Sequence, residues 1–395
     1  MDKKFDIIVY GATGFTGSLC AKYLKENYSG LHWAVAGRNK EKLSLLCKNI
    51  GANCQVFVAD ANDSLALDNI TQKTKVVLST AGPFHRYGSK LVASCVKNST
   101  HYVDITGENF WVKQMISQHH QEAKRKRVRI VPSCGYDSIP SDLGCLFSAT
   151  SFGKEIDFIH SFHTWKGEPS GGTIETMFSS RKAGVNKGAF GRFALNPKNS
   201  VSSKQKELTT DRVSVEKNST IGAWTGPFIM AMANTRVVRR GAALLEELGT
   251  GYGKDFVYKE HAYYPSAKTA YTATLFLGLA GLVIATPLSR LVRPFLRKPG
   301  QGPNQEAMDR GFFKCKFVVK GKNGEQKVYE SRGSGDPGYK VTSKLVCESA
   351  ISLLEDPSSL PGGASWGGVL TPSSGMGNVL VERLKRVGIV FKEVF

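Results

Sequence analysis

The chain has 395 residues, enough for about two or three domains, and 41% of them are hydrophobic, which suffices for a packed core. Its net charge of +20 gathers mainly around residues 124–129, 236–240 and 290–298, but no nucleic-acid-binding motif accompanies these groups, so we expect no nucleic-acid partner. The eight cysteines form no C-x-x-C pair and no metal-ligand cluster, and no signal peptide precedes the first strand, so we expect a cytoplasmic protein without a metal site.

The first predicted strand, residues 5–10, runs into a glycine turn, Gly11-Ala-Thr-Gly14-Phe-Thr-Gly17, and then into a helix. This order is typical of the phosphate-binding start of a dinucleotide fold, in which the glycines allow a tight turn, close approach of the pyrophosphate and close helix packing. The spacing is G-x-x-G-x-x-G rather than the commoner G-x-G-x-x-G, so an ordinary strand-to-helix turn remains the alternative. We assign to cofactor binding Gly11, Thr13, Gly14, Phe15, Thr16 and Gly17.

The second predicted strand ends near residue 37, where an acidic residue would hold the ribose 2′-hydroxyl of NAD. Arg38 stands there instead, and its guanidinium suits a 2′-phosphate, so we favour NADP(H) over NAD(H). A solvated surface arginine is the alternative. Asp60, at the end of the third strand, is predicted to lie near the adenine or to cap the following helix.

Strands and helices continue to alternate up to residue 132, which predicts a doubly wound, parallel Rossmann sheet. Ligands of such sheets lie beyond the carboxyl ends of the strands, here residues 81–87, 106–109 and 133–141. Ala81 and Gly82 therefore complete the predicted cofactor site.

After residue 144 the pattern changes to strands at 155–165, 312–319 and 326–331, which predicts an inserted mixed α+β domain. Residues 195–222 are polar and are expected to form a long exposed loop. The last part is mainly helical. We therefore expect a Rossmann domain at 1–144, an inserted domain at 145–340 and C-terminal helices at 341–395 that pack back on the first domain.

Residues 270–289 carry no charge, and a basic stretch follows them up to residue 298. One interpretation of this segment is an apolar surface that dips into one leaflet of a membrane, with its arginines bound to lipid phosphates. A buried or dimer-interface helix is the second and a membrane span the third. We expect the protein to lie at a membrane or lipid surface through 270–298, with a homodimer as the further partner.

Several motifs resemble the saccharopine dehydrogenase-like oxidoreductases, a family that includes trans-acting enoyl reductases and a lipid-droplet protein of animals. The matching stretches are the glycine turn, Ala81-Gly-Pro-Phe84, Tyr102-Val-Asp-Ile-Thr-Gly-Glu108, Cys134-Gly-Tyr-Asp-Ser-Ile-Pro-Ser-Asp-Leu-Gly144, Gly335-Asp-Pro-Gly-Tyr339 and Gly367-Gly-Val-Leu-Thr-Pro372. The resemblance implies a Rossmann domain, an inserted mixed sheet and a reductase of a lipid or polyketide-like chain. True saccharopine reductases differ in the segment at 135–140, so their amino-dicarboxylate substrate is not implied.

Hydride transfer needs a nicotinamide held against the acceptor and an acid that supplies a proton. Tyr136 and Asp137 follow the sixth predicted strand and are our candidates for that acid, with Ser133, Ser138 and Glu108 nearby in the topology. Each also has a structural interpretation: Tyr136 as a core aromatic, Asp137 as a turn residue and Glu108 as a helix cap. A non-catalytic lipid-surface protein that keeps a nucleotide-binding fold is the alternative function.

Overall fold

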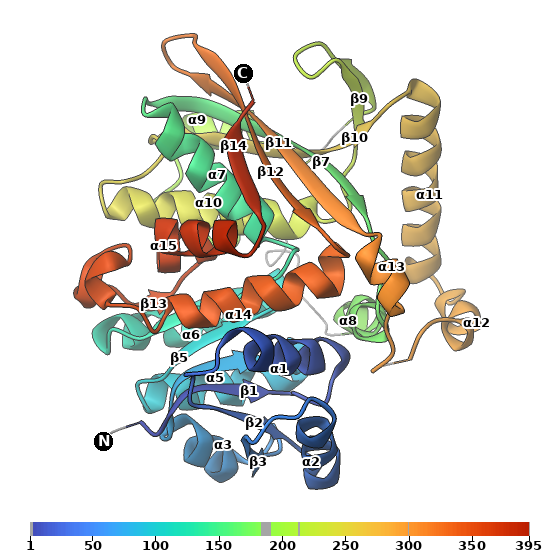
Figure 1. Cartoon of the computed structure of the whole chain (residues 1–395). Helices are drawn as coiled ribbons and strands as arrows, with labels where there is room; N and C mark the ends of the chain where they lie inside the picture. Colours follow the sequence, from blue (N-terminus) through green and yellow to red (C-terminus); the bar gives the residue numbers. More distant parts are fainter. Residues whose placement is uncertain (1–2, 183–190, 212–213, 299, 395) are drawn as a thin grey trace.

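The computed structural model describes residues 3–182, 191–211, 214–298 and 300–394, and within them the strands form two sheets of seven (Figure 1). The first sheet is parallel throughout and has the order β13-β6-β5-β4-β1-β2-β3. Its strands are β1 Phe5–Tyr10, β2 Trp33–Gly37, β3 Gln55–Val58, β4 Thr74–Ser79, β5 His101–Asp104, β6 Arg129–Val131 and β13 Gly368–Val369. The predicted doubly wound Rossmann sheet is therefore confirmed.

Helices cover both faces of this sheet, which explains why its strands are apolar without interruption: Ile7, Ile8 and Val9 of β1 are all fully buried. One face carries α3, α5 and α6, and α1 packs on the other. The helices of this domain are α1 Phe15–Asn27, α2 Lys40–Asn49, α3 Ser64–Thr71, α4 Phe84–Tyr87, α5 Ser89–Lys97 and α6 Asn109–Arg125.

The second sheet is mixed, with the order β14-β12-β11-β7-β10-β9-β8 and a single parallel pair, β7 with β10, among the described strands. Its strands are β7 Ile156–Lys166, β8 Glu216–Asn218, β9 Ala223–Gly226, β10 Val257–Tyr264, β11 Phe312–Gly321, β12 Gln326–Ser334 and β14 Val390–Glu393. Helices α7 Ile139–Phe152 and α10 Ala231–Glu247 cover one face of it. A Cβ on Gly144 would lie 2.2 Å from Cζ of Phe317, so only glycine lets α7 approach β11 this closely. The expected boundary at residue 144 thus falls inside α7.

The C-terminal segment fills the space between the two sheets (Figure 1). It consists of η3 Pro337–Val341, α14 Thr342–Ser352, η4 Pro357–Ser359, η5 Gly363–Ser365 and α15 Pro372–Arg386, followed by β14. Helix α14 packs on α1, where Glu348 accepts a hydrogen bond of 2.8 Å from the Tyr23 hydroxyl and pairs at 3.0 Å with Arg383 of α15. This segment also adds one edge strand to each sheet, β13 and β14, and neither strand was predicted.

The expectation of an exposed segment at 195–222 holds for most of its described residues, but the segment is not a loop throughout, and its residues 212 and 213 lie outside the described residues. This segment contains α9 Ser203–Leu208 and β8, an edge strand of the second sheet, and Leu195 is 1% exposed. Two buried arginines hold the start of this segment, because Arg239 donates to the carbonyl of Arg192 and Arg240 to that of Leu195. With Arg236 also buried, the basic cluster at 236–240 is part of the interior and offers no charged surface.

Helices α8 Gly171–Lys182, α11 Ala267–Ala285, α12 Ser289–Val292 and α13 Gln305–Asp309, with η2 Arg293–Phe295, lie at the right of Figure 1. Helix α11 stands along the outside of the body, in contact with β9, β10 and α8. Its outer face is exposed, for example Leu275 at 65% and Phe276 at 72%. The interpretation of 270–289 as a buried core helix is therefore wrong for this chain.

Candidate active site

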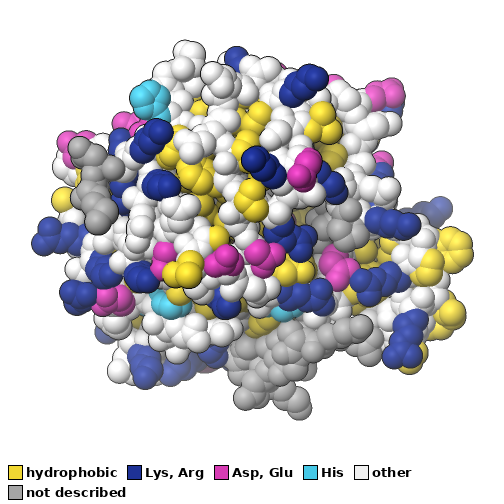
Figure 2. Space-filling view, turned by 90° about the horizontal axis from the view of Figure 1, so that it is seen from below, with side chains coloured by type: hydrophobic (Ala, Val, Ile, Leu, Met, Phe, Trp, Pro, Cys, Tyr) yellow, Lys and Arg dark blue, Asp and Glu magenta, His cyan; other side chains and the backbone are white. Residues whose placement is uncertain are grey.

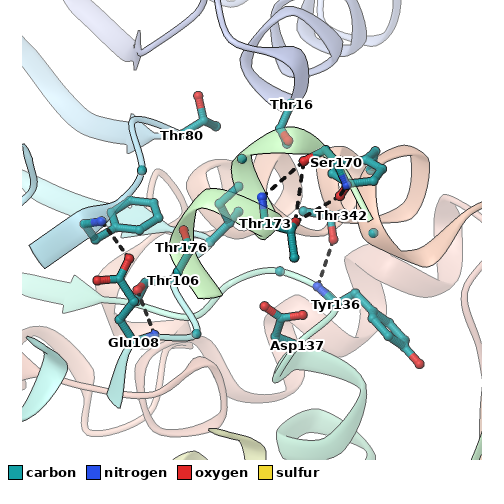
Figure 3. Close-up of a pocket in the computed structure, with 18 of the residues that line it drawn as sticks. Thr16, Thr80, Thr106, Glu108, Tyr136, Asp137, Ser170, Thr173, Thr176 and Thr342 are labelled. Atoms are coloured by element: carbon teal, nitrogen blue, oxygen red, sulfur yellow. Dashed lines mark hydrogen bonds between the residues drawn. The ribbon is translucent and has the colours of Figure 1, made fainter. Parts of the chain in front are cut away.

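A cleft of about 830 Å³ opens where the carboxyl ends of the Rossmann strands face the second domain. Its Rossmann side is formed by the segments that follow β1, β2, β4, β5 and β6. Its opposite side is formed by the end of β7, the first turns of α8, the start of α10 and η3. In the view of Figure 3, Thr16 and Thr80 are seen above the first turns of α8 and Asp137 is seen below them.

The glycine turn after β1 has the geometry that a dinucleotide requires. Gly11 has a φ of +81°, and a Cβ there would lie 2.9 Å from the Ala81 nitrogen, so the position accepts only glycine without strain. A Cβ on Gly17 would lie 2.4 Å from the Gly11 carbonyl oxygen, which explains how α1 begins so close to β1. Gly14 is the N-cap of α1 and makes no side-chain cap hydrogen bond, so the helix N-terminus faces the cleft ready for an anion.

The predicted cofactor residues lie in this cleft with two exceptions. Those that line it are Gly11, Thr13, Gly14, Phe15, Thr16, Arg38, Ala81 and Gly82. Gly17 is behind the turn. Asp60 is also outside the lining, because its carboxylate turns back to accept a hydrogen bond of 2.8 Å from the Asn62 N–H. The cap of α3 is Asp63, which accepts from two backbone N–H groups, so the alternative of Asp60 as that cap is wrong.

Arg38 lies at the end of β2 with its side chain exposed and its guanidinium 5.9 Å from the centre of the Tyr87 ring. Both residues line the cleft, next to Gly37 and Ala61. A cation held over an aromatic face beside the predicted adenosine position is accessible to an anionic group of the ligand.

Glu108 organises the loop after β4. Its buried carboxylate accepts hydrogen bonds from the Phe84 N–H at 2.8 Å, the His85 N–H at 2.9 Å and the His85 Nδ1 at 2.6 Å. It stands at the N-cap position of α6 but its side chain makes no cap bond, so the interpretation as a helix cap is wrong for the side chain. Glu108 instead fixes the loop that carries Ala81 and Gly82 into the cleft.

Tyr136 and Asp137 both lie at the cleft but point in different directions (Figure 3). The Tyr136 ring packs on Phe313 with 5.5 Å between ring centres, and its buried hydroxyl has no hydrogen-bond partner among the described residues. Burial raises its pKa well above the usual value. The Asp137 carboxyl turns toward the cleft, and burial raises its pKa to about 6. The geometry therefore favours Asp137 over Tyr136 as a proton donor.

The second-domain wall of the cleft was missed by the sequence reasoning. Trp165, Phe228 and Met232 supply an apolar surface, and Tyr339 of η3 contacts Ser170 and Thr173 at the start of α8. The motif at 335–339 has a structural role that its sequence does not reveal. Its Asp336 carboxylate accepts hydrogen bonds from the Tyr339 N–H at 2.8 Å and the Glu168 N–H at 3.3 Å, which joins η3 to this wall. No group of three or more potential metal ligands occurs in the part of the chain that the structure describes.

A parallel Rossmann sheet with a phosphate-binding turn, joined by one cleft to a mixed-sheet domain, is the architecture of a dinucleotide-binding protein. A family model described as the saccharopine dehydrogenase NADP binding domain matches residues 7–131. A Mycobacterium tuberculosis protein provisionally named a trans-acting enoyl reductase is 34% identical over 411 residues, which cover 98% of this chain and 97% of that protein. The trans-acting enoyl reductase of Mycobacterium bovis is 32% identical over 425 residues with the same coverage.

Among solved structures, the apo saccharopine dehydrogenase (L-Glu forming) of Saccharomyces cerevisiae matches 99% of this chain and 100% of its own with a TM-score of 0.55 at 11% identity, which shows the shared fold. The chain belongs to the saccharopine dehydrogenase-like oxidoreductase family.

Proposed function

We propose that this protein is an NADP(H)-dependent reductase that reduces an enoyl double bond in an apolar, lipid or polyketide-like substrate. The main support for the proposal is that the same cleft is lined by the dinucleotide turn and, opposite it, by a wall of apolar side chains. The names of the relatives support an enoyl reductase. NADP(H) is favoured over NAD(H) because the residue that follows β2 at the cleft is Arg38 and not a carboxylate.

The apolar wall supports a substrate with a hydrocarbon part. It consists of Phe110, Trp165, Phe228, Ile229, Met230 and Met232. Ile229 is 49% and Met232 55% exposed at the start of α10, so apolar surface continues from the cleft outward. Such a surface favours an acyl chain over the amino-dicarboxylate of true saccharopine reductases.

Reduction of an enoyl group adds a hydride to one carbon and a proton to the other, and a bound nicotinamide cofactor supplies the hydride. Asp137 is our candidate for the proton donor because its carboxyl faces the cleft and its raised pKa, about 6, keeps part of it protonated near neutral pH. Glu108 positions the loop after β4 against the cofactor, and the α1 N-terminus receives the pyrophosphate.

We also propose that the protein works at a lipid surface in the cytoplasm, through the docking segment Ala267–Lys298. Residues Ala267–Ile284 are long and apolar enough to cross a membrane, and 6% of this stretch is buried. Figure 2 shows hydrophobic side chains beside Lys and Arg side chains on the lobe at the right, where α12 lies in Figure 1. Apolar side chains next to arginines fit an interface with anionic lipid.

The position of α11 favours a helix that lies along the lipid surface over one that spans it. Both ends of α11 return to the body, through β10 at its start and through contacts of Arg293 with α8 after its end. A spanning helix, about 28 Å long at 1.5 Å per residue, would draw the polar strands and helices beside it into hydrocarbon. A dimer formed through the same face is the competing outcome.

The proposal is tested with purified protein, NADPH, and enoyl thioesters of short and long chain length. We expect NADPH oxidation with the long-chain thioester and slower oxidation with the short one, followed by absorbance. Cofactor binding in calorimetry without oxidation of NADPH by any enoyl substrate would support the non-catalytic lipid-surface alternative. A lack of nucleotide binding would refute both functions.

A further inference from the structure

One wall of the cleft, residues 168–176, lies between the ligand space and the docking segment. The residues of this wall segment that line the cleft are Glu168, Pro169, Ser170, Gly172, Thr173 and Thr176. In Figure 3, Ser170, Thr173 and Thr176 stand along the start of α8 and face the other labelled cleft residues. Any displacement of this wall segment therefore changes access to the cleft.

On its inner side the wall segment is held by contacts with two parts of the body. The Tyr339 hydroxyl contacts the Ser170 N–H and lies 2.9 Å from the Thr173 hydroxyl oxygen. Arg86, in the helix that follows the cofactor loop, pairs with Glu175 at 3.3 Å. These contacts close the wall segment onto the Rossmann domain and η3.

On its outer side the same wall segment is held by two arginines of the docking segment. Arg293 pairs with Glu175, and Arg297 pairs with Glu168 and donates to the Pro169 carbonyl oxygen at 2.8 Å. The Arg293 and Arg297 side chains are 49% and 35% exposed, so both remain accessible from solvent.

The surroundings of these arginines are apolar and exposed. Leu288 and Leu291 are 50% and 69% exposed, and Phe295, between the two arginines in sequence, is 89% exposed. If these side chains enter a lipid surface, the two guanidinium groups come to the depth of the phosphates. Phosphate oxygens bind guanidinium in the same bidentate way as a carboxylate, so they compete directly with Glu175 and Glu168.

We propose that phosphates of an anionic lipid surface bind Arg293 and Arg297, release Glu175 and Glu168, and so let residues 168–176 move away and open the cleft toward the lipid. The inference rests on the lipid-surface part of the proposed function. Ion pairs whose arginines are this accessible to solvent are individually weak, so a surface that offers many phosphates at once competes with them. The cleft then gains an opening on its lipid-facing side, where an apolar chain is available.

Hydrogen–deuterium exchange of the full-length protein tests this inference, with exchange of the 168–176 amides as the readout. The probes are vesicles of phosphatidylcholine with phosphatidylglycerol, vesicles of phosphatidylcholine alone, and soluble glycerophosphate. We expect the anionic vesicles to speed exchange in 168–176 at least about fivefold, with little change for the other two probes. An equal effect of glycerophosphate would show a soluble phosphate ligand and overturn the lipid source.

The double variant Glu168→Gln/Glu175→Gln removes both carboxylates, including the Glu175 carboxylate that Arg86 also holds, and leaves every residue of the docking segment unchanged. It should still bind anionic vesicles, and its wall amides should exchange fast without any lipid. Arg125→Gln breaks an exposed ion pair on α6 and is the matched control, with wild-type behaviour expected. Vesicle binding by the wild type with unchanged exchange at 168–176 would overturn the coupling and leave the lipid-surface proposal intact. Absence of vesicle binding would overturn both.

Discussion

Glu108→Gln tests how the loop after β4 is held, and the structure allows the expected loss of stability to be worked out. One carboxylate oxygen accepts from the Phe84 N–H, and the other accepts from the N–H and the ring nitrogen of His85. A glutamine at this position keeps one oxygen and replaces the other with an NH₂ group, which is itself a donor. Whichever way the amide turns, at least one buried N–H faces another donor and loses its partner.

The expected change in the free energy of unfolding follows from these hydrogen bonds. An unsatisfied buried N–H costs about 1–3 kcal/mol, and replacing charge-assisted bonds by neutral ones at the remaining oxygen costs about 1 kcal/mol more. We therefore expect Glu108→Gln to lower the free energy of unfolding by about 2–4 kcal/mol. Because the loop it holds lines the cleft, NADPH affinity should fall as well.

Urea denaturation followed by circular dichroism measures the first effect and calorimetric titration of NADPH the second. The control is Glu122→Gln on the exposed face of α6, where the carboxylate pairs with Arg125 and its loss should change stability by less than about 0.5 kcal/mol. If Glu108→Gln proves as stable as this control, the carboxylate does not hold the loop and our account of the site is wrong.

Three further predictions concern the cofactor, the proton donor and the lipid surface. NADPH should bind at least about tenfold tighter than NADH, and Arg38→Ala should remove most of this preference because a bidentate phosphate contact is lost. Equal affinities of the wild-type protein for NADPH and NADH in calorimetry would contradict this prediction. Turnover should fall as the pH rises through about 6, since the acid form of Asp137 is then lost. Asp137→Asn should lower turnover by about 10²- to 10⁴-fold and leave NADPH affinity unchanged. A variant with the wild-type rate and pH profile would show that Asp137 is not the proton donor. Replacing Arg290, Arg293 and Arg297 by Gln should weaken co-sedimentation with anionic vesicles by about 1 kcal/mol per charge, and unaltered sedimentation at low salt would point to the dimer interpretation of α11.

Local patterns in the sequence were sufficient for six of the seven strands of the Rossmann sheet. The apolar run of β1, the glycine turn and the alternation that follows are signals carried by neighbouring residues, and the carboxyl-edge rule then places Gly11, Ala81 and Asp137 near one another. Arg38 could be assigned to the same edge for the same reason. The second domain could be predicted as a mixed sheet, but its contribution to the cleft could not.

Tertiary structure decided the features that depend on which surfaces meet. The arginines of α10 have the composition of a basic patch, yet they are buried because carbonyls of residues 192 and 195 happen to lie against them. The strand β13 consists only of Gly368–Val369, and it forms because these residues pair with the edge of β6. Tyr136 and Asp137 are neighbours in sequence, but the Tyr136 ring packs on Phe313 and the Asp137 carboxyl faces the cleft. Such outcomes depend on contacts between residues far apart in the chain, and local periodicity carries no information about them.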